Sequence, residues 1–261
     1  MNETADPASL IRGKHVVVTG GARGIGAAIA HKLHALGAIT TLMGRDEAAL
    51  IEACNALSGS AWQVADVTDS ASVGAAFAAA TQHFGPVEIL INNAGAAESA
   101  PFSQTNEALW DRMLAVNLSG MFYCQQQVIE PMRSVHWGRI VNVVSTAGLL
   151  GYAYVAAYCA AKHGAIGLTR ALALEVAREG ITVNAVCPGF TATDLLEDSI
   201  QNIMDTTGRS REEAEKSLKA VNPQRRFIQP DEVATTVAWL CSEGSQSING
   251  QSIAVAGGEV M

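Results

Sequence analysis

Three residues capable of acid–base chemistry lie near one another in the middle of the chain: Ser145, Tyr158 and Lys162. Tyr158 and Lys162 are four positions apart, so on a helix they share one face. An ammonium group ~4 Å from a phenol interacts with its charged form by about 4 kcal/mol at an effective dielectric constant of about 20. This predicts a Tyr158 pKa near neutrality and a side chain that exchanges a proton with a substrate oxygen.

Each of these residues also has an ordinary structural interpretation when it is taken alone. Tyr158 fits a core aromatic residue, Lys162 fits a helix surface, and Ser145 fits a cap at the end of a strand. Their combined spacing, behind a glycine-rich loop, favours the chemical interpretation.

The glycine-rich segment at residues 19–26 (TGGARGIG) directly follows an apolar run and precedes a helical pattern. Gly20 permits a tight turn, Gly24 lets the backbone approach a pyrophosphate, and Gly26 permits close packing of helix on strand. A helix N-terminus offers free N–H groups to a phosphate. The spacing differs from the commoner G-x-G-x-x-G, and a purely structural turn is the alternative, but the position after the first strand favours dinucleotide binding.

The elements that position these residues alternate between short apolar runs and helical patterns. This order predicts a Rossmann-type α/β fold, a doubly wound parallel sheet of seven strands within a single domain over residues 1–261. The expected strands are His15–Thr19, Thr40–Met43, Ala61–Ala65, Ile89–Asn92, Arg139–Val144, Thr182–Cys187 and Ser252–Val255. The expected helices include Ile25–Leu36, Ser70–Phe84, Asn106–Met132 and Tyr154–Glu179, with Gly37, Gly85 and Gly180 just after three of them.

One connection, at about residues 190–228, is too long for an ordinary loop. Its apolar spacing from Leu195 onward predicts one helix, and Ser210 with Glu213 forms a capping-box pattern that begins a second. The following helix opens at Gln229-Pro230-Asp231. A helical insertion at the carboxyl edge of a parallel sheet predicts a substrate lid.

The composition excludes several classes of function. Acidic residues exceed basic ones by 25 to 17, so neither a basic nucleic-acid-binding face nor a polybasic membrane anchor is expected. The sequence shows no apolar run long enough to span a membrane and no signal-peptide pattern at Met1, which together favour a cytoplasmic protein. The scattered cysteines favour reduced thiols, and His31 and His34 fit a solvated helix face, so we expect no metal site.

The end of the second strand bears on the choice of cofactor. Gly44 offers no carboxylate for the 2′-hydroxyl of NAD, whereas Arg45 can pair with a 2′-phosphate, so NADP(H) is favoured. If Arg45 is only a solvated surface residue, NAD(H) remains possible. Asp66 and Val67 are expected at the adenine, and the run Asn92-Asn93-Ala94-Gly95 ends the fourth strand at the same edge of the sheet.

With these motifs the chain resembles the short-chain dehydrogenase/reductases over nearly its whole length. The matching segments are TGGARGIG (19–26), DV (66–67), NNAG (92–95), Asn117, Ser145, YCAAK (158–162) and PGFTAT (188–193). The resemblance implies that Tyr158 exchanges the proton and that Ser145 orients the substrate oxygen. It implies that Lys162 lowers the Tyr158 pKa and binds the nicotinamide ribose, while Asn117 holds a water that links Lys162 to solvent.

The same resemblance implies the cofactor contacts. The expected residues are Gly20, Arg23, Gly24, Ile25, Gly26, Arg45, Asp66, Val67, Asn93, Ala94, Gly95, Pro188, Gly189, Thr191 and Thr193, together with Tyr158 and Lys162. Thr191, where an aliphatic residue is common, and Cys159, next to Tyr158, depart from the family pattern and leave the chemistry intact. The implied reaction is reversible hydride transfer between the nicotinamide and a carbonyl carbon.

The residues expected around the substrate are apolar, which favours a lipid-like, aromatic or acyl substrate over a sugar. They are Leu149, Leu150, Tyr152, Phe190, Leu195 and Leu196. The segment from Tyr158 to Asp194 resembles 3-oxoacyl thioester reductases and polyketide ketoreductases, so a 3-oxoacyl or 3-hydroxyacyl thioester is the leading candidate. Contact of a carrier's phosphates with Arg209, Arg211, Arg225 and Arg226 is one hypothesis, and ordinary solvated arginines are the alternative.

Two other functions stay open at this point. One is a secondary-alcohol, steroid or aromatic-ketone dehydrogenase of the same family. The other is a non-catalytic regulator that senses NADP, against which the intact Ser145, Tyr158 and Lys162 argue. By family analogy the long helices pair across subunits in a homotetramer or a dimer.

Overall fold

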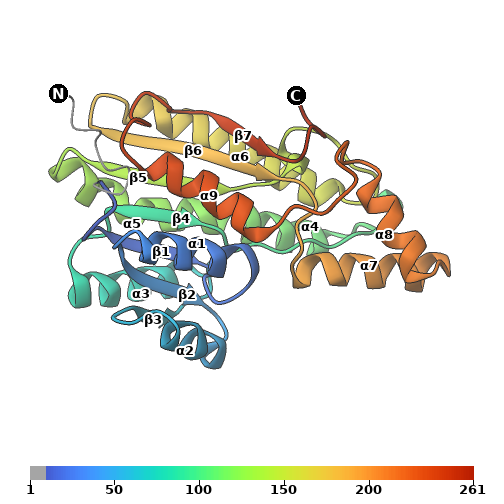
Figure 1. The fold of residues 1–261 in the computed structure, drawn as a ribbon, viewed down its shortest axis with the longest axis horizontal. Coiled ribbons are helices and arrows are strands. Elements are labelled where there is room, and N and C mark those ends of the chain that lie inside the picture. Colours follow the sequence, from blue (N-terminus) through green and yellow to red (C-terminus); the bar gives the residue numbers. More distant parts are fainter. Residues whose placement is uncertain (1–9) are drawn as a thin grey trace.

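The computed structural model describes residues 10–261, in which seven strands form one sheet. The strands are β1 (His15–Thr19), β2 (Ile39–Gly44), β3 (Ala61–Val64), β4 (Ile89–Asn92), β5 (Gly138–Val143), β6 (Ile181–Pro188) and β7 (Ser252–Val255). Their order is β3-β2-β1-β4-β5-β6-β7, and every neighbouring pair is parallel. The strand order reverses between β1 and β4, which is where doubly wound folds bind their ligands (Figure 1).

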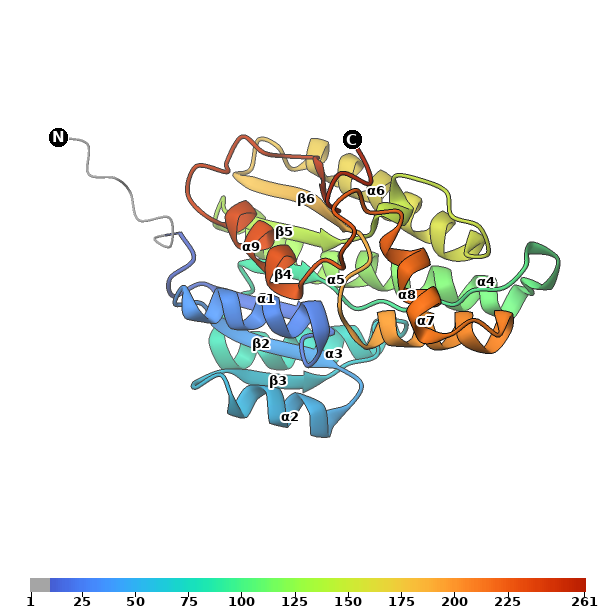
Figure 2. The same cartoon turned by 45° about the vertical axis from the view of Figure 1, so that its right-hand side comes forward.

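Helices cover both faces of this sheet. They are α1 (Gly24–Ala35), α2 (Glu47–Asn55), α3 (Ser70–Phe84), α4 (Glu107–Leu114), α5 (Gly120–Ser134), α6 (Ala156–Glu175), α7 (Asp194–Thr207), α8 (Arg211–Lys219) and α9 (Pro230–Cys241). Helices α1 and α9 lie side by side on one face (Figures 1 and 2). Consecutive residues of β1 show that both faces are buried, since Val16 and Val18 pack with α1 residues and Val17 belongs to the cluster that contains Phe77 of α3.

The predicted Rossmann-type fold is confirmed, with strand ends that differ by one residue at most. The helix expected at 106–132 is α4 and α5 joined by a π-helical turn, Ala115–Ser119. The helix expected at 154–179 is shorter at both ends. It begins at Ala156 because Tyr154 has a φ of 69°, and it ends at Glu175, after which turns lead to Gly180.

The segment 190–228 contains the two predicted helices, α7 and α8. The capping box of Ser210 and Glu213 begins α8, and Pro230 is the first residue of α9. Leu196 and Ile200 of α7 pack with Ala214 of α8 in a small cluster of their own, because neither helix lies against the sheet. Figures 1 and 2 show both helices beyond the carboxyl end of β6, next to α4.

Candidate active site

Ser145, Tyr158 and Lys162 meet at the carboxyl end of β5. Ser145 caps a 3-10 turn, Thr146–Gly148, that follows the strand, and α6 carries the other two residues. Lys162 is only 4% exposed, its Nζ donates to the carbonyl oxygen of Val143 at 3.2 Å, and it lies 5.5 Å from the centroid of the Tyr158 ring. The structure therefore brings together the acid–base residues that the sequence singled out.

Burial is the largest influence on the pKa of Tyr158 and on the pKa of Lys162. Desolvation raises the pKa of Tyr158 to about 12, and a hydrogen bond with the Ser145 side chain acts in the opposite direction. Desolvation lowers the pKa of Lys162 to about 8. The expected Tyr158 pKa near neutrality is wrong for this structure, because the loss of hydration outweighs any help from a lysine that is itself desolvated. The phenol of Tyr158 therefore holds its proton more tightly here than a solvated tyrosine does.

Asn117 lies in the π-helical turn between α4 and α5 and is 1% exposed. Its Nδ2 donates to the carbonyl oxygens of Ala96 (2.8 Å) and Met113 (3.1 Å), and its Oδ1 accepts from the backbone N–H of Ala96 (3.3 Å). A Cβ on Gly95 would lie 2.9 Å from Asn117 Oδ1 and 3.7 Å from Lys162 Nζ. The NNAG loop thus rests directly on Asn117 and Lys162, and single π-helical turns of this kind are frequent at functional sites.

The glycine-rich loop has the geometry that a dinucleotide needs. Gly20 and Gly24 have φ values of 62° and 53°, which favour glycine. A Cβ on Gly26 would lie 2.1 Å from the carbonyl oxygen of Gly20, so only glycine fits there. The first turn of α1 has no acidic residue, and Arg23 provides no side-chain cap, which leaves N–H groups open to a phosphate. A Cβ on Gly24 would lie 3.1 Å from Cγ2 of Thr193, so Thr193 flanks this loop.

Thr19 joins this loop to the NNAG segment, a role that the sequence analysis missed. Its Oγ1 accepts from the backbone N–H groups of Asn93 and Ala94, both at 3.0 Å. The Asn93 side chain donates to the carbonyl oxygens of Thr19 and Gly20, both at 3.1 Å. These bonds connect the ends of β1 and β4, the two strands between which the strand order reverses. The one sequence signal was a polar residue at the end of the run VVVT.

At the end of β2, Arg45 is exposed and acts on Asp66. Hydrogen bonds from Thr68 hold the pKa of Asp66 below its usual value, and the charge of Arg45 adds to this effect. The next residue, Asp46, caps α2 by accepting from Ala49 N–H at 3.1 Å and also forms an ion pair with Arg23. The carboxylate of Asp46 is therefore already used by the cap of α2 and by Arg23.

Val67 packs against the start of α5, since a Cβ on Gly120 would lie 2.8 Å from the Val67 carbonyl oxygen. Ile25 is partly buried against the core under α1. At the end of β6, which is Pro188, the hydroxyl of Thr191 donates to the carbonyl oxygen of Gly189 at 2.9 Å. Thr191 is thereby held inside the loop that follows the strand.

Two of the residues expected around the substrate are occupied in internal packing. Leu149 packs against the cluster of Met121 and Ile166, and Leu196 lies between α7 and α8. Leu150 and Leu195 are 40% and 41% exposed. These two, rather than the packed pair, have apolar surface to offer a ligand.

Tyr152 and Phe190 meet edge to face, with ring centroids 6.5 Å apart. The Tyr152 hydroxyl donates to the carboxylate of Glu259 and shares a hydrogen bond with Thr146 Oγ1 at 2.9 Å. The second carboxylate oxygen of Glu259 is buried, and a Cβ on Gly189 would lie 2.8 Å from it. Glu259 escaped the sequence analysis because it lies at the far end of the chain, with no motif around it.

Within residues 10–261, no group of three or more His, Cys, Asp or Glu side chains has an arrangement that could hold a metal ion. The same part of the chain contains no helix of the length and hydrophobicity that a membrane span requires. All five cysteines are free.

The fold and the site define a nucleotide-binding α/β protein with a serine, a tyrosine and a lysine at the carboxyl edge. Residues 14–203 match the family model described as short chain dehydrogenase. Among curated proteins, D-beta-hydroxybutyrate dehydrogenase of Rhizobium meliloti is 37% identical over 94% of this chain and 98% of its own. Levodione reductase of Leifsonia aquatica is 34% identical over 99% and 98%.

Among solved structures, a substituted actinorhodin polyketide ketoreductase crystallised with NADPH matches with a TM-score of 0.91. It is 36% identical, and the match covers 94% of this chain and 97% of the other. The chain belongs to the short-chain dehydrogenase/reductase family. It is a nucleotide-dependent oxidoreductase of carbonyl and alcohol groups.

Proposed function

We propose that this protein reduces the 3-oxo group of an acyl thioester with NADPH, and that it can catalyse the reverse oxidation of a 3-hydroxyacyl thioester. The observation that carries the proposal is the placement of Tyr158 beside Ser145 and Lys162, at the edge of the sheet where the glycine-rich loop opens. A phenol held beside a lysine ammonium can give its proton to a carbonyl oxygen, as reduction of a carbonyl requires.

The bound nicotinamide would supply the hydride to the carbonyl carbon. Tyr158 gives its proton to the carbonyl oxygen, which becomes the hydroxyl of the product, and Ser145 holds that oxygen in place. The positive charge of Lys162 stabilises the tyrosinate that forms. Asn117 fixes the NNAG loop against Lys162 and positions the water through which Tyr158 regains a proton.

The preference for NADP(H) is supported by the end of β2. Gly44 has no carboxylate, and Asp46 is engaged as the cap of α2 and as the partner of Arg23. The guanidinium of Arg45 is exposed and its charge helps to lower the pKa of Asp66, which supports Arg45 as the partner of a 2′-phosphate. The remaining cofactor contacts are proposed at Gly20, Gly24, Ile25, Gly26, Val67, Asn93, Ala94, Gly95, Pro188, Gly189, Thr191 and Thr193.

The acyl substrate is supported by the exposed apolar side chains beside the site. Leu150 and Leu195 offer this surface, Tyr152 and Phe190 are partly buried and meet edge to face, and residues 190–228 are proposed as the lid over the site. The hydroxybutyrate dehydrogenase among the relatives fits a substrate oxygenated at the 3-position, and the polyketide ketoreductase among the solved structures fits the reduction of a ketone. The levodione reductase relative favours a cyclic or aromatic ketone as the second candidate.

The arginines of the lid give less support to a carrier-bound substrate. Arg211 pairs with Glu197 and Glu215, and Arg226 pairs with Glu232. Arg225 donates to the carbonyl oxygen of Ala220 at 2.8 Å. We therefore propose a thioester whose recognition rests on the acyl chain.

A substrate panel tests this proposal. The purified protein is mixed with NADPH or NADH and with a 3-oxoacyl N-acetylcysteamine thioester, a cyclic diketone or a steroid ketone, and nicotinamide absorbance is followed. We expect the highest kcat/KM for the thioester with NADPH. Turnover of the diketone alone would favour the second candidate, while NADPH binding without turnover of any compound would favour an NADP-sensing regulator.

We also propose a cytoplasmic homotetramer or dimer. Trp110 of α4, Phe122 of α5 and Leu174 of α6 are 39%, 41% and 82% exposed, which is apolar surface on the long helices expected to pair between subunits. Light scattering coupled to size-exclusion chromatography is expected to give the mass of two or four chains. The mass of one chain at micromolar concentration would contradict it.

A further inference from the structure

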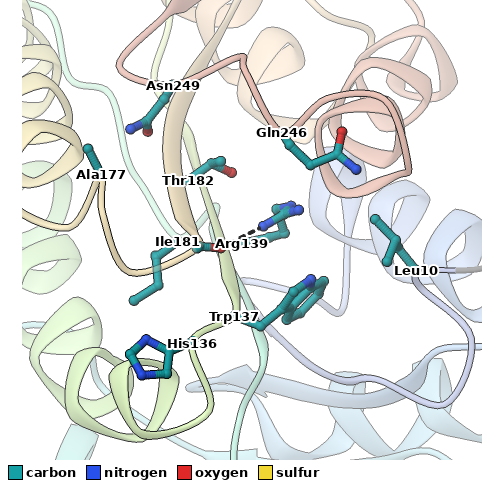
Figure 3. Close-up of a pocket in the computed structure, with 10 residues that line it drawn as sticks. Leu10, His136, Trp137, Arg139, Ala177, Ile181, Thr182, Gln246 and Asn249 are labelled. Carbon is teal, nitrogen blue, oxygen red and sulfur yellow. Dashed lines mark hydrogen bonds between the residues drawn. The ribbon is translucent and has the colours of Figure 1, made fainter.

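A cavity of about 310 Å³ lies at the amino edge of the sheet, opposite the site described above. The first residues of β5 and β6 form its floor, and Leu10, Trp137 and Gln246 form part of its wall. Figure 3 shows the guanidinium of Arg139 between the side chains of Gln246 and Trp137. The volume lies in the range of small-molecule sites.

Arg139 is a buried cation without a carboxylate partner among residues 10–261. The residue is 2% exposed, and burial lowers the pKa of its guanidinium. Its Nη1 donates to the carbonyl oxygens of Gly138 (2.8 Å) and Gly180 (3.2 Å), while its Nε is buried and has no partner in this part of the chain. An arginine in an apolar medium is costly to keep unless an anion compensates it.

The groups around Arg139 add donors and no negative charge. No Asp or Glu lines the cavity in the described chain. The carboxylate of Glu88 is occupied by Lys14 at 2.5 Å, and Lys14 lies over one side of the Trp137 ring at 4.4 Å. Arg139 lies over the same ring at 4.8 Å. The cavity is therefore electropositive and has one aromatic wall.

Two further polar side chains of the cavity stand ready to contact a ligand. Thr182 and Gln246 line it, and within residues 10–261 neither side chain makes a hydrogen bond. Beside the guanidinium of Arg139 from β5, the Thr182 hydroxyl and the Gln246 amide supply donors from β6 and from the segment before β7. A fork of guanidinium donors is the group that best matches carboxylate and phosphate oxygens.

We propose that this cavity binds a small organic oxyanion, a carboxylate or a phosphate monoester, with Arg139 as the anchor and the apolar body of the ligand against Trp137. The site is separate from the proposed active site, because it lies at the amino ends of β5 and β6 and shares no residue with the carboxyl edge. Binding there needs neither nicotinamide nor turnover.

Isothermal titration calorimetry on the intact protein tests this proposal. Phenyl phosphate and benzoate are the two anionic probes, and benzyl alcohol is the neutral one. We expect one of the anions to bind and the alcohol not to bind, and the tighter anion identifies the class. The variant Arg139→Gln should bind at least tenfold more weakly, because it loses a charged hydrogen bond.

Two milder variants keep the test decisive if Arg139→Gln does not fold. Thr182→Val and Gln246→Ala each remove one donor and should weaken binding about threefold to tenfold. Arg45→Gln is the control at the carboxyl edge, where added phosphate also suits the glycine-rich loop, and should leave binding at the cavity unchanged. A loss of binding in Arg45→Gln together with wild-type binding in the Arg139, Thr182 and Gln246 variants would overturn the proposal.

A carboxylate of the chain itself is the competing occupant. Glu3 and Asp6 precede Leu10 of the cavity wall in the sequence, and they lie outside the described residues. If either of them filled the cavity, the double variant Glu3→Gln and Asp6→Asn would bind the probes more tightly than the wild type. We expect the double variant and the wild type to bind the probes with equal affinity. Tenfold tighter binding by the double variant would overturn the proposal that the cavity takes a separate ligand.

Discussion

Lys162 at the carboxyl edge of the sheet and Arg139 at its amino edge are both nearly inaccessible to solvent, with 4% and 2% of their surface exposed. Each donates to a backbone carbonyl of β5, Val143 in one case and Gly138 in the other. Burial brings the pKa of Lys162 down to about 8, whereas an arginine stays charged throughout the physiological range. A group that can exchange protons, supplied by α6, thus lies at one end of β5, and a permanent charge lies at the other end.

The largest effect is expected from removing the ammonium group of Lys162. Lys162→Met should lower kcat by about 10³-fold, because Tyr158 loses the charge that stabilises its anion. Steady-state absorbance with NADPH measures this change. The control is Lys32→Met on the exposed side of α1, which should leave kcat unchanged. Equal kcat values for the wild type and Lys162→Met would remove the functional contrast between the two edges.

The same variant tests the cost of burial. The pKa of Lys162 is about 8 when folded against about 10.4 when unfolded, so the buried ammonium costs about 3 kcal/mol below pH 8. The cost declines between pH 8 and about 10.4, where the unfolded chain also loses this proton. Urea unfolding at pH 7 should therefore show Lys162→Met to be the more stable protein, with the difference shrinking toward pH 10. A less stable variant at pH 7 would contradict the lowered pKa.

The next effect concerns the glycine-rich loop. Gly26→Ala places a Cβ 2.1 Å from the Gly20 carbonyl oxygen, so we expect a loss of about 1–3 kcal/mol in stability and a large loss of NADPH affinity. The matched control is Gly74→Ala in α3, where a Cβ meets nothing within 4 Å and should gain up to about 1 kcal/mol. Denaturant unfolding and fluorescence titration with NADPH measure both. Wild-type affinity in Gly26→Ala would show that the cofactor does not use this loop.

Much of the fold and of the candidate site could be predicted from the sequence. The strands and the positions of Ser145, Tyr158 and Lys162 follow from local patterns, because apolar runs, glycine punctuation and an i, i+4 spacing are read within a few residues. The roles of Thr19, Gly95 and Glu259 depend on contacts between distant segments, and no local pattern reveals them.

The predictions that proved wrong, and the feature that was missed, also depend on contacts between distant segments. The Tyr158 pKa was predicted from one pairwise charge, whereas desolvation, which requires the surrounding packing, is the largest contribution. Leu196 was expected to face a substrate because it is apolar, yet it packs between α7 and α8, two helices that need a core of their own. Arg139 carried no signal, since a single arginine that opens a strand is unremarkable until its partners are known.

The smallest effect is expected at the adenosine end of the site. Arg45→Gln should weaken NADPH binding about tenfold and change NADH binding less than twofold, because only NADPH carries the 2′-phosphate. Fluorescence titration of both nucleotides measures the ratio. Equal losses for the two nucleotides would mean that Arg45 does not read the phosphate, and NAD(H) would become the favoured cofactor.

Tyr158 is the proposed proton donor, and the variant Tyr158→Phe isolates the contribution of its hydroxyl. The substitution removes one hydroxyl from a partly buried ring and leaves Lys162 and the glycine-rich loop in place. With NADPH and the 3-oxoacyl thioester, kcat should fall by about 10²–10⁴-fold, while the Kd for NADPH stays within about twofold of the wild type. Turnover at the wild-type rate with normal NADPH binding would contradict the proposed chemistry at the carboxyl edge.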